Sequence, residues 1–366
     1  MPDATTDTNP AYWAEYSNLQ RVKHALIRRY LGGWFAKLGS WAGDVVYFDT
    51  HAGRGRHSTG EFGSPLVALQ TPLAHRSRDR LLGRCQFHFV LIERDEENLE
   101  ALNREIRALG NIPQGIQIRP FVGDSYAHLT ELLADLRAQR ARLAPAFVFV
   151  DPYGFKVPCA LLRDLMRAGR VELFVNVIWR ELDMAIAQGD KPGMAATLDL
   201  VFDGPDWRSR ITSANFDTRA DQAVDLLAEK ISARWPTFVR MLGDNNATRY
   251  LLVHFTNHDA GRDLMKECMW AECPDGGFFV RKSDDPAQQL LISREPNLAP
   301  LRDWTVRELS QGPKRWSKLT EALRQENWRS PHLRTVLGEL KREGVIVAED
   351  YTGRFGPGGN PLLRLA

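Results

Sequence analysis

The stretch 45–55, VVYFDTHAGRG, decides the fold class of this chain. A short apolar run ends in Asp49 and passes directly into a turn that contains Gly53 and Gly55. This pattern is typical of a buried β strand that leads into a turn where the backbone approaches a ligand. The dinucleotide fingerprint G-x-G-x-x-G is matched only in part, and no Lys-Ser/Thr pair completes a phosphate-binding loop. A tight strand-to-helix turn without a ligand is the alternative interpretation.

Further apolar runs repeat this scheme along the chain. The sequence predicts strands at 87–92, 116–122, 147–150, 171–178 and, later, 249–256. Amphipathic stretches with helical spacing separate the first of these runs. Strands that alternate with helices form βαβ units and a parallel sheet. Because the runs are almost entirely apolar, helices should cover both faces of the sheet. We therefore predict an α/β fold with a Rossmann-like sheet.

An acidic residue stands at the end of four of the predicted strands. These residues are Asp49, Glu93, Asp124 and Asp151. The carboxyl ends of parallel strands meet at one edge of the sheet, and open α/β sheets bind their ligands along that edge. The sequence therefore predicts that the four carboxylates surround one ligand.

Two of these acids suit an adenosyl group. Glu93 at a strand end is placed to accept hydrogen bonds from two ribose hydroxyls. Asp124, which follows Gly123, is placed to accept the amino N–H of an adenine. The alternatives are structural: Glu93 as an acid near a helix N-terminus, and Asp124 as a helix N-cap.

The segment 151–155, DPYGF, is the most specific motif. The carboxylate of Asp151 and the carbonyl at Pro152 can both accept protons from an exocyclic amine, which holds the nitrogen lone pair toward an electrophile. Tyr153 offers a face on which a nucleobase stacks, an interaction worth ~1–3 kcal/mol. An ordinary Asp-Pro turn is the alternative. Taken together, the motifs predict a class I methyltransferase that uses S-adenosyl-L-methionine.

Local motifs resemble known methyltransferases. The segment 47–57, YFDTHAGRGRH, together with Lys23 and His24, resembles the adenine-N6 methyltransferases of 23S ribosomal RNA. Those proteins carry an Asp-Pro-Pro-Tyr motif, whereas this chain has Asp-Pro-Tyr-Gly at 151–154. That variant is similar to the Asp-Pro-Phe-Gly of tRNA guanine-N2 dimethyltransferases. Both motif variants occur in enzymes that methylate exocyclic amines. The resemblance therefore implies methyl transfer to an exocyclic amine and leaves the target base open.

Over nearly its full length, the chain resembles the three-Cys-motif partner protein (TcmP) family of bacteria. The similar segments are KHALIRRYLGGWFAKL at 23–38, GEFGSPLVAL at 60–69, FVFVDPYGF at 147–155 and HFTNHDAGRDLMKECMW at 254–270. The resemblance implies a methyltransferase-like domain, a C-terminal DNA-binding-like region and a three-Cys-motif partner protein.

The resemblances also imply roles for individual residues. Lys23 and His24 would hold the methionine carboxylate of the cofactor, and Ser64 with Gly63 would close over it. The expected cofactor-binding residues are Lys23, His24, Asp49, His51, Gly53, Gly55, Ser64, Glu93, Gly123 and Asp124. The expected catalytic residues are Asp151, Pro152 and Tyr153.

The chain divides into two predicted domains. Residues 1–295 form the methyltransferase-like domain, with 183–245 as a helical insertion. Residues 300–366 contain short helices followed by a hairpin, which predicts a winged helix. This part holds 12 Lys and Arg against 8 Asp and Glu, and this excess is compatible with nucleic acid binding. The expected nucleic-acid contacts are Arg329, His332, Arg334, Lys341, Arg342 and Arg354. A winged helix that docks a protein is the alternative.

Composition limits the remaining possibilities. Four cysteines in 366 residues do not make a disulfide framework, no apolar run approaches the ~20 residues of a membrane helix, and the first ten residues lack a signal peptide's apolar segment,. We expect a cytoplasmic protein without a membrane partner. His254 and His258 lie on a predicted strand end, where their spacing does not favour a metal site, so no metal is expected.

The leading hypothesis is methyl transfer to an exocyclic amino nitrogen of a nucleobase in DNA or RNA. The first alternative is a non-catalytic module that binds the cofactor and DNA and recruits a three-Cys-motif enzyme. A nucleotide-dependent oxidoreductase is the third reading, weakened by the incomplete glycine fingerprint.

Overall fold

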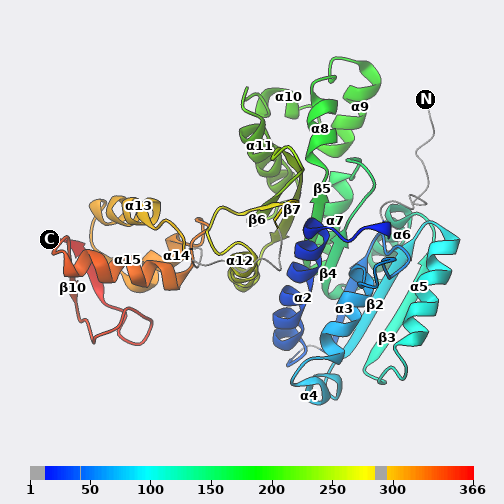
Figure 1. Ribbon diagram of the computed structural model, residues 1–366, viewed down its shortest axis with the longest axis horizontal. Helices are drawn as coiled ribbons and strands as arrows, with labels where there is room; N and C mark the ends of the chain where they lie inside the picture. Colours follow the sequence, from blue (N-terminus) through cyan, green and yellow to red (C-terminus); the bar gives the residue numbers. More distant parts are fainter. Residues whose placement is uncertain (1–12, 42, 285–294) are drawn as a thin grey trace. The chain divides into compact units, whose positions relative to one another are not determined.

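The structure is a computed structural model that describes residues 13–41, 43–284 and 295–366 (Figure 1). The chain divides into two compact units. The larger unit comprises 13–261 with 279–284, and the smaller comprises 262–278 with 295–366. Each unit has a hydrophobic core of its own.

The larger unit is built on an eight-stranded sheet in the order β3-β2-β1-β4-β5-β7-β6-β8. The strands are β1 (Asp44–Asp49), β2 (Gln86–Glu93), β3 (Ile116–Val122), β4 (Leu143–Val150), β5 (Gly169–Val177), β6 (Trp235–Leu242), β7 (Thr248–Thr256) and β8 (Phe279–Arg281). β1 to β5 run parallel, whereas β7 is antiparallel to both of its neighbours. The predicted Rossmann-like α/β sheet is therefore confirmed.

The strand order fixes where a ligand can bind. From β1 the chain moves outward through β2 to β3, and then returns to the other side of β1 to form β4. The direction of winding thus changes between β1 and β4. In open α/β sheets the crevice beside such a switch point, at the carboxyl ends of the strands, is the usual ligand site.

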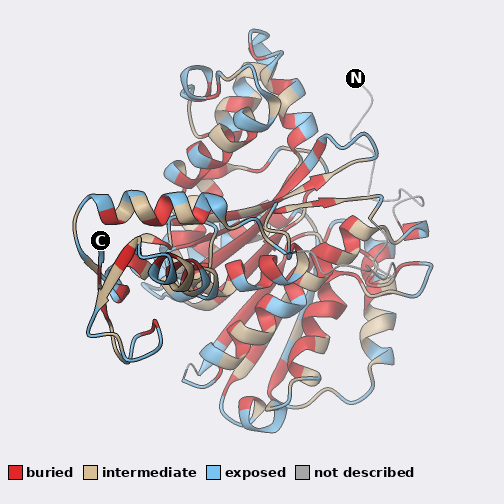
Figure 2. Ribbon diagram, turned by 60° about the vertical axis from the view of Figure 1, so that its left-hand side comes forward, coloured by how far each residue is buried: buried red, intermediate tan, exposed pale blue. Residues whose placement is uncertain are grey.

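Helices cover the sheet. They are α2 (Asn18–Leu38), α3 (Ser64–Leu73), α4 (Arg78–Leu82), α5 (Glu96–Ala108), α6 (Ser125–Ala138), α7 (Cys159–Ala168), α8 (Trp179–Ile186), α9 (Pro192–Val201), α10 (Trp207–Arg210) and α11 (Phe216–Lys230). Buried residues follow the strands and the inner faces of these helices (Figure 2). Fully buried aromatic rings, among them Phe89 of β2 and Phe147 of β4, belong to the central strands. No helix among the described residues combines the length and apolar character needed to traverse a membrane.

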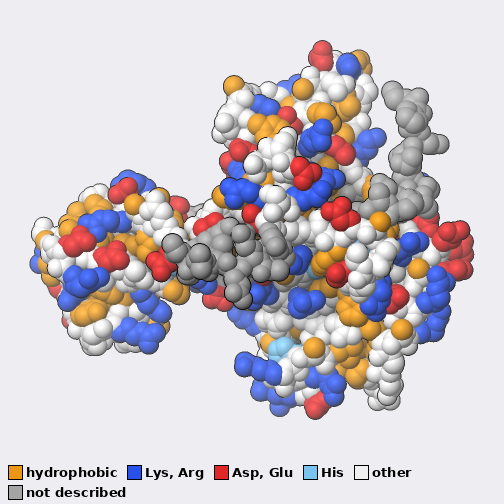
Figure 3. Space-filling view, viewed as in Figure 1, with side chains coloured by type: hydrophobic (Ala, Val, Ile, Leu, Met, Phe, Trp, Pro, Cys, Tyr) orange, Lys and Arg blue, Asp and Glu red, His pale blue; other side chains and the backbone are white. Residues whose placement is uncertain are grey.

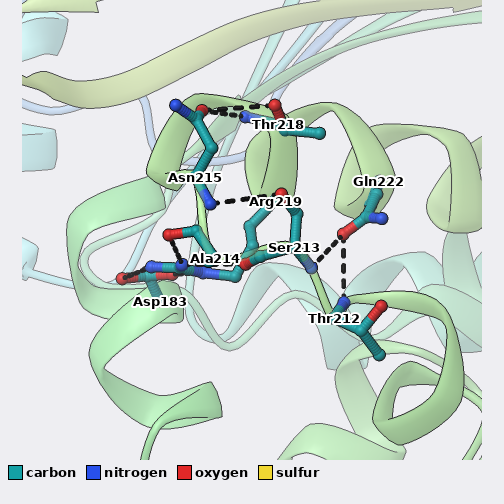
Figure 4. A network of polar contacts seen from close by, with 8 residues as sticks. All are labelled: Asp183, Thr212, Ser213, Ala214, Asn215, Thr218, Arg219 and Gln222. Atoms are coloured by element: carbon teal, nitrogen blue, oxygen red, sulfur yellow. Dashed lines mark hydrogen bonds and ion pairs between the residues drawn. The ribbon is translucent and has the colours of Figure 1, made fainter.

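The sequence predicted the segment 183–245 as a helical insertion. In the structure this segment is only partly helical. Most of α8 and the helices α9 to α11 lie in it, but it ends in β6, which pairs with β7. Alternate residues of β6 are buried, and its sequence WPTFVRML includes Pro236, Thr237 and Arg240, so it was not recognised as a strand. Asp183 on α8 accepts hydrogen bonds from Arg219 on α11 at 2.7 and 3.0 Å, which ties these helices together (Figure 4).

The smaller unit combines four helices with a three-stranded antiparallel sheet in the order β10-β11-β9. Its elements are α12 (Asp259–Glu272, in this unit from residue 262), α13 (Ala299–Ser310), β9 (Lys314–Arg315), α14 (Trp316–Ala322), α15 (Ser330–Arg342), β10 (Ile346–Glu349) and β11 (Leu362–Leu365). Leu319, Leu333, Leu337 and Leu363 lie fully buried in its core.

The boundary between the units differs from the predicted one near residue 295, because residues 262–278 belong to the smaller unit. Arg262 and Lys266 of α12 are buried and donate hydrogen bonds to main-chain carbonyls of residues 323–328. Positive charges stabilise carbonyls that are left without partners beyond the end of a helix. This pairing joins segments about 60 residues apart, so composition along the chain did not reveal it.

Candidate functional site

A cavity of about 400 Å³ lies at the carboxyl edge of the sheet in the larger unit. Its walls come from α2, from the loop after β1, and from the ends of β4, β5 and β7. This is the edge at which the strand order places a ligand crevice.

The cavity brings together eight of the predicted residues of the larger unit. They are Lys23, His24, His51, Gly53, Ser64, Asp151, Pro152 and Tyr153. Five others do not line this cavity: Asp49, Gly55, Glu93, Gly123 and Asp124. Of the four strand-end acids, Asp151 alone is in the cavity wall, so the described structure does not show the single ring of carboxylates that the sequence suggested.

Asp151 carries a negative charge held by two neighbours. Lys23 Nζ lies 2.5 Å from its Oδ2, and Asn176 Nδ2 donates to its Oδ1 at 2.6 Å. Burial alone would raise the pKa of this carboxyl, but the charge and hydrogen bond of Lys23 and the hydrogen bond of Asn176 hold it below its ordinary value. Lys23 was expected to hold the cofactor's carboxylate. In this structure its ammonium pairs with Asp151, and its predicted contact with the cofactor stays a prediction.

Glu93 braces the glycine-rich turn. Its side chain is buried, with one carboxylate oxygen accepting the Gly53 N–H at 2.6 Å and the other accepting the Asp95 N–H at 2.9 Å. Burial raises the pKa of Glu93, and the hydrogen bonds from the main chain oppose that shift. The carboxylate thus fixes the loop after β1, and its predicted contact with ribose hydroxyls stays a prediction.

Asp124 is the N-cap of α6, which was the alternative interpretation of this residue. It is exposed, and its Oδ1 accepts the Ala127 N–H at 2.9 Å. Gly123 before it has a φ of 140°, and a Cβ atom there would lie 2.8 Å from His128 Nε2. The adenine contact predicted for Asp124 stays a prediction.

Asp49 lies beneath the cavity, at the end of β1. It accepts hydrogen bonds from Tyr47 Oη at 3.0 Å, from the His51 N–H at 3.3 Å, and from Ser64. Burial raises its pKa to about 7, while these hydrogen bonds oppose the shift. Burial also lowers the pKa of His51 to about 4, so this imidazole is neutral at physiological pH.

Gly53 allows a tryptophan to pack on the turn. Its φ is 62°, and a Cβ atom would lie 2.5 Å from the indole of Trp13. Trp13 is buried and lines the cavity. Any side chain at position 53 would therefore displace this indole and strain the turn.

Two neutral histidines complete the wall near α2. His24 Nδ1 lies 2.9 Å from Tyr16 Oη, and the His57 ring packs against Trp13 at 4.8 Å. Burial is the main cause of the lowered pKa of both imidazoles, which for His57 falls to about 4. These two imidazoles therefore offer polar nitrogen atoms without positive charge.

Sequence reasoning missed several cavity residues. Arg249 and Tyr250 reach the site because β7 is antiparallel, so its first residues lie at the carboxyl edge of the parallel strands. Lys282 follows β8 at the same edge. Asn176 could have been found, because it is, with Glu172, one of the two polar residues in the mainly apolar run VELFVNVI.

The basic residues predicted on the C-terminal unit differ in exposure. Lys341, Arg342 and Arg354 are exposed, whereas Arg329, His332 and Arg334 are partly buried. Both His332 and Arg329 pack on the Trp270 ring. The centroid of this ring lies 4.1 Å from the His332 ring centroid and 5.5 Å from Arg329 Cζ. On the face shown in Figure 3, basic and acidic side chains are interspersed over this unit.

No protein-family model matches the chain, and no curated protein matches it. Among solved structures, it is similar to human methyltransferase-like protein 13 in complex with SAH, with 11% identity and a TM-score of 0.34, covering 65% of this chain and 82% of that one. It is also similar to the methyltransferase domain of bacterial CtHen1-CN, with 14% identity and a TM-score of 0.30, covering 63% of this chain and 99% of that one.

Proposed function

We propose that this chain transfers a methyl group from S-adenosyl-L-methionine to an exocyclic amino nitrogen of a nucleobase in DNA or RNA. The observation that carries this proposal is the ionised Asp151 carboxylate, in the wall of a cavity at the carboxyl end of β4. Beside it, Tyr153 keeps 51% of its surface exposed, and this ring offers a stacking face for a base.

The cavity also suits the cofactor. The main chain at Gly53 and Gly63 lines it without side chains, and His24 and His51 present neutral rings to a sulfonium. S-Adenosyl-L-methionine supplies a methyl group already activated on a positively charged sulfur. The protein's task is then to position the acceptor amine and exclude competing nucleophiles.

Asp151 would orient the acceptor by accepting one of its N–H bonds, which points the nitrogen lone pair at the methyl carbon. As the N–C bond forms, the C–S bond breaks and its electron pair passes to sulfur. The positive charge moves to nitrogen, which then loses a proton to the Asp151 carboxylate or to water. No strong base is required, because the proton leaves after the attack.

The smaller unit supports a nucleic acid as the acceptor. From α13 to β11 the unit consists of a helix, a strand, two helices and a hairpin, an order that agrees with the proposed winged helix. Lys341, Arg342 and Arg354 would contact phosphates, which position a protein on nucleic acid without reading sequence. A three-Cys-motif partner and a cytoplasmic location in bacteria belong to the same proposal.

The test is transfer of labelled methyl from S-adenosyl-L-methionine to bacterial total DNA and total RNA by the full chain. We expect Asp151→Ala and the isosteric Asp151→Asn to reduce incorporation about 100-fold or more, while binding of S-adenosylhomocysteine persists. Asp79→Ala, which removes an exposed carboxylate on α4, is the matched control. Full activity of both Asp151 variants would contradict the mechanism.

A second function has one observation in its favour. Both oxygens of Asp151 already have protein partners, Lys23 and Asn176, which suits a module that binds the cofactor without using it. Such a protein would recruit a three-Cys-motif enzyme to DNA. Cofactor binding without methyl incorporation, with the partner protein present, would support this function instead.

A further inference from the structure

Asn176 has a buried amide in the wall of the cavity. It lies near the end of β5, between Val175 and Val177, and only 6% of its surface is exposed. Its Nδ2 donates to Asp151 Oδ1. The orientation of the amide follows from chemistry, because an ionised carboxylate accepts hydrogen bonds and cannot donate them.

The other end of this amide lacks a partner. Asn176 Oδ1 is buried and has no hydrogen-bond donor among the residues that the structure describes. A buried acceptor without a donor costs about 1–3 kcal/mol, so such groups in native proteins call for a partner or a function. Asn176 lines the cavity, so a ligand bound there can supply the donor once a small movement of the side chain opens the enclosed Oδ1 to it.

Asp151 has acceptor capacity next to this amide. A carboxylate offers about four lone-pair positions, and Lys23 and Asn176 occupy two of them. The Lys23 ammonium is itself held by Asp151. A ligand beside these side chains therefore meets two acceptors, the Asp151 carboxylate and Asn176 Oδ1.

We propose that Asn176 contacts the acceptor directly: its Oδ1 accepts one N–H of a primary amino group while Asp151 accepts the other. This inference rests on the proposed function and narrows its substrate class. A ring nitrogen without hydrogen would direct its lone pair at two acceptors and be repelled. A monomethylated amine keeps one N–H and loses one of the two contacts. The acceptor is therefore a primary exocyclic amine, and the product carries a single methyl group.

The binding test uses two cofactor analogues. In sinefungin, a carbon that bears an amino group replaces the methylated sulfur, which places N–H donors at the transfer point. S-Adenosylhomocysteine has the same adenosyl and amino-acid parts and no donor there. With the full chain in titration calorimetry, we expect Asn176→Leu to lower the affinity for sinefungin about 10-fold or more. The same variant should lower the affinity for S-adenosylhomocysteine less than about twofold.

A second variant separates this contact from mere support of Asp151. Asn176→Asp keeps an oxygen acceptor and replaces the donated N–H by a proton shared between the two carboxyl groups, so sinefungin affinity should stay within about threefold of the wild type. Asn111→Leu, at an exposed loop position, is the matched control, and Asn176→Ala replaces Asn176→Leu if the latter fails to fold.

Three results would overturn the proposal. If Asn176→Leu lowers the affinity for both analogues equally, the amide contacts the adenosyl or amino-acid part that the two analogues share. If Asn176→Leu leaves the affinity for sinefungin unchanged, Asn176 does not contact the ligand. If Asn176→Leu and Asn176→Asp lower this affinity equally, Asn176 acts only by supporting Asp151. If the wild-type chain binds neither analogue, the proposed function itself fails, which is a distinguishable outcome.

The product gives an independent check. Nucleic acid methylated by the wild-type chain is digested to nucleosides and analysed by mass spectrometry. We expect a nucleoside with one methyl group on an exocyclic amine. A ring-methylated nucleoside or a dimethylamino product would contradict the two-acceptor geometry, even if methyl transfer itself is confirmed.

Discussion

Two carboxylates near the same cavity differ in the sign of their pKa shift. Asp151 has a cationic neighbour, so its pKa falls, whereas Asp49 is buried among neutral donors and its pKa rises to about 7. Near neutral pH, a single added charge close to Asp49 would thus change its protonation. The positive sulfonium of the cofactor would favour the ionised form.

Asp49 should make stability depend on pH. The native chain keeps this proton up to about pH 7, while the unfolded chain releases it near the ordinary value of 3.8. The native state therefore binds more protons between these values, and its free energy of unfolding falls as pH rises through them. One pKa unit corresponds to about 1.4 kcal/mol. As the pH is raised from 5 to 8, the free energy of unfolding of Asp49→Asn should therefore increase by about 2 kcal/mol or more relative to that of the wild type.

Urea unfolding at the two pH values measures this difference. Asp79→Asn, at an exposed position on α4, controls for the loss of one surface charge. A difference between Asp49→Asn and wild type that does not change with pH would contradict the assignment.

At the residue scale, the sequence placed Asp151 correctly at a strand end, but not the partners of the acids. Apolar runs locate strand ends, and strand ends locate carboxylates. Whether a carboxylate faces a ligand or a main-chain N–H depends on local turns. Glu93 and Asp124 each accept from main-chain N–H groups close by, and no pattern of residue types distinguishes the two outcomes.

At the scale of elements, α2 carries the cavity residues Lys23 and His24, so its first turn should matter for binding. Ser17 and Gln20 form a capping box at its start, and both line the cavity. Ser17→Ala should lower the free energy of unfolding by about 1 kcal/mol and also weaken binding of S-adenosylhomocysteine.

The N-cap Asn215 of α11 provides the comparison. Its side chain accepts the Thr218 N–H at 2.9 Å, and it does not line the cavity. Asn215→Ala should cost similar stability, measured by chemical unfolding, and leave calorimetric binding unchanged. Equal effects of the two variants on binding would show that the first turn of α2 has no special role.

Strands rich in apolar residues were predictable from the sequence, even where the structure leaves most of the strand exposed, as in β3. The predicted runs 87–92 and 116–122 correspond to Gln86–Glu93 and Ile116–Val122. β6 was missed because its residues alternate in burial, and β8 because it spans three residues. Lys282, the cavity residue that follows β8, was missed for the same reason.

At the scale of the molecule, two units with separate cores should unfold in two calorimetric transitions. Lys266 is buried and donates to the carbonyls of Leu323, Glu326 and Trp328, all within the smaller unit. Lys266→Ala leaves these carbonyls short of a donor, so it should destabilise the smaller unit by about 2 kcal/mol or more. The transition of the larger unit should not move.

Lys318→Ala is the matched control, because Lys318 is exposed on α14 of the same unit and its ion pair with Glu321 is worth little. Scanning calorimetry distinguishes the outcomes. A shift of both transitions in Lys266→Ala would contradict the assignment of α12 from residue 262 to the smaller unit.

Asn18 Nδ2 donates to the main-chain carbonyl of Arg281 at 2.9 Å, across 263 positions of sequence. A ribosome that adds about 5–20 residues per second needs roughly 13–53 s to synthesise the chain between them. During that interval the helix that begins at Asn18 has emerged without its final neighbour. The nascent chain therefore completes the cavity wall between α2 and β8 late in synthesis, well after the first strands of the sheet have been made.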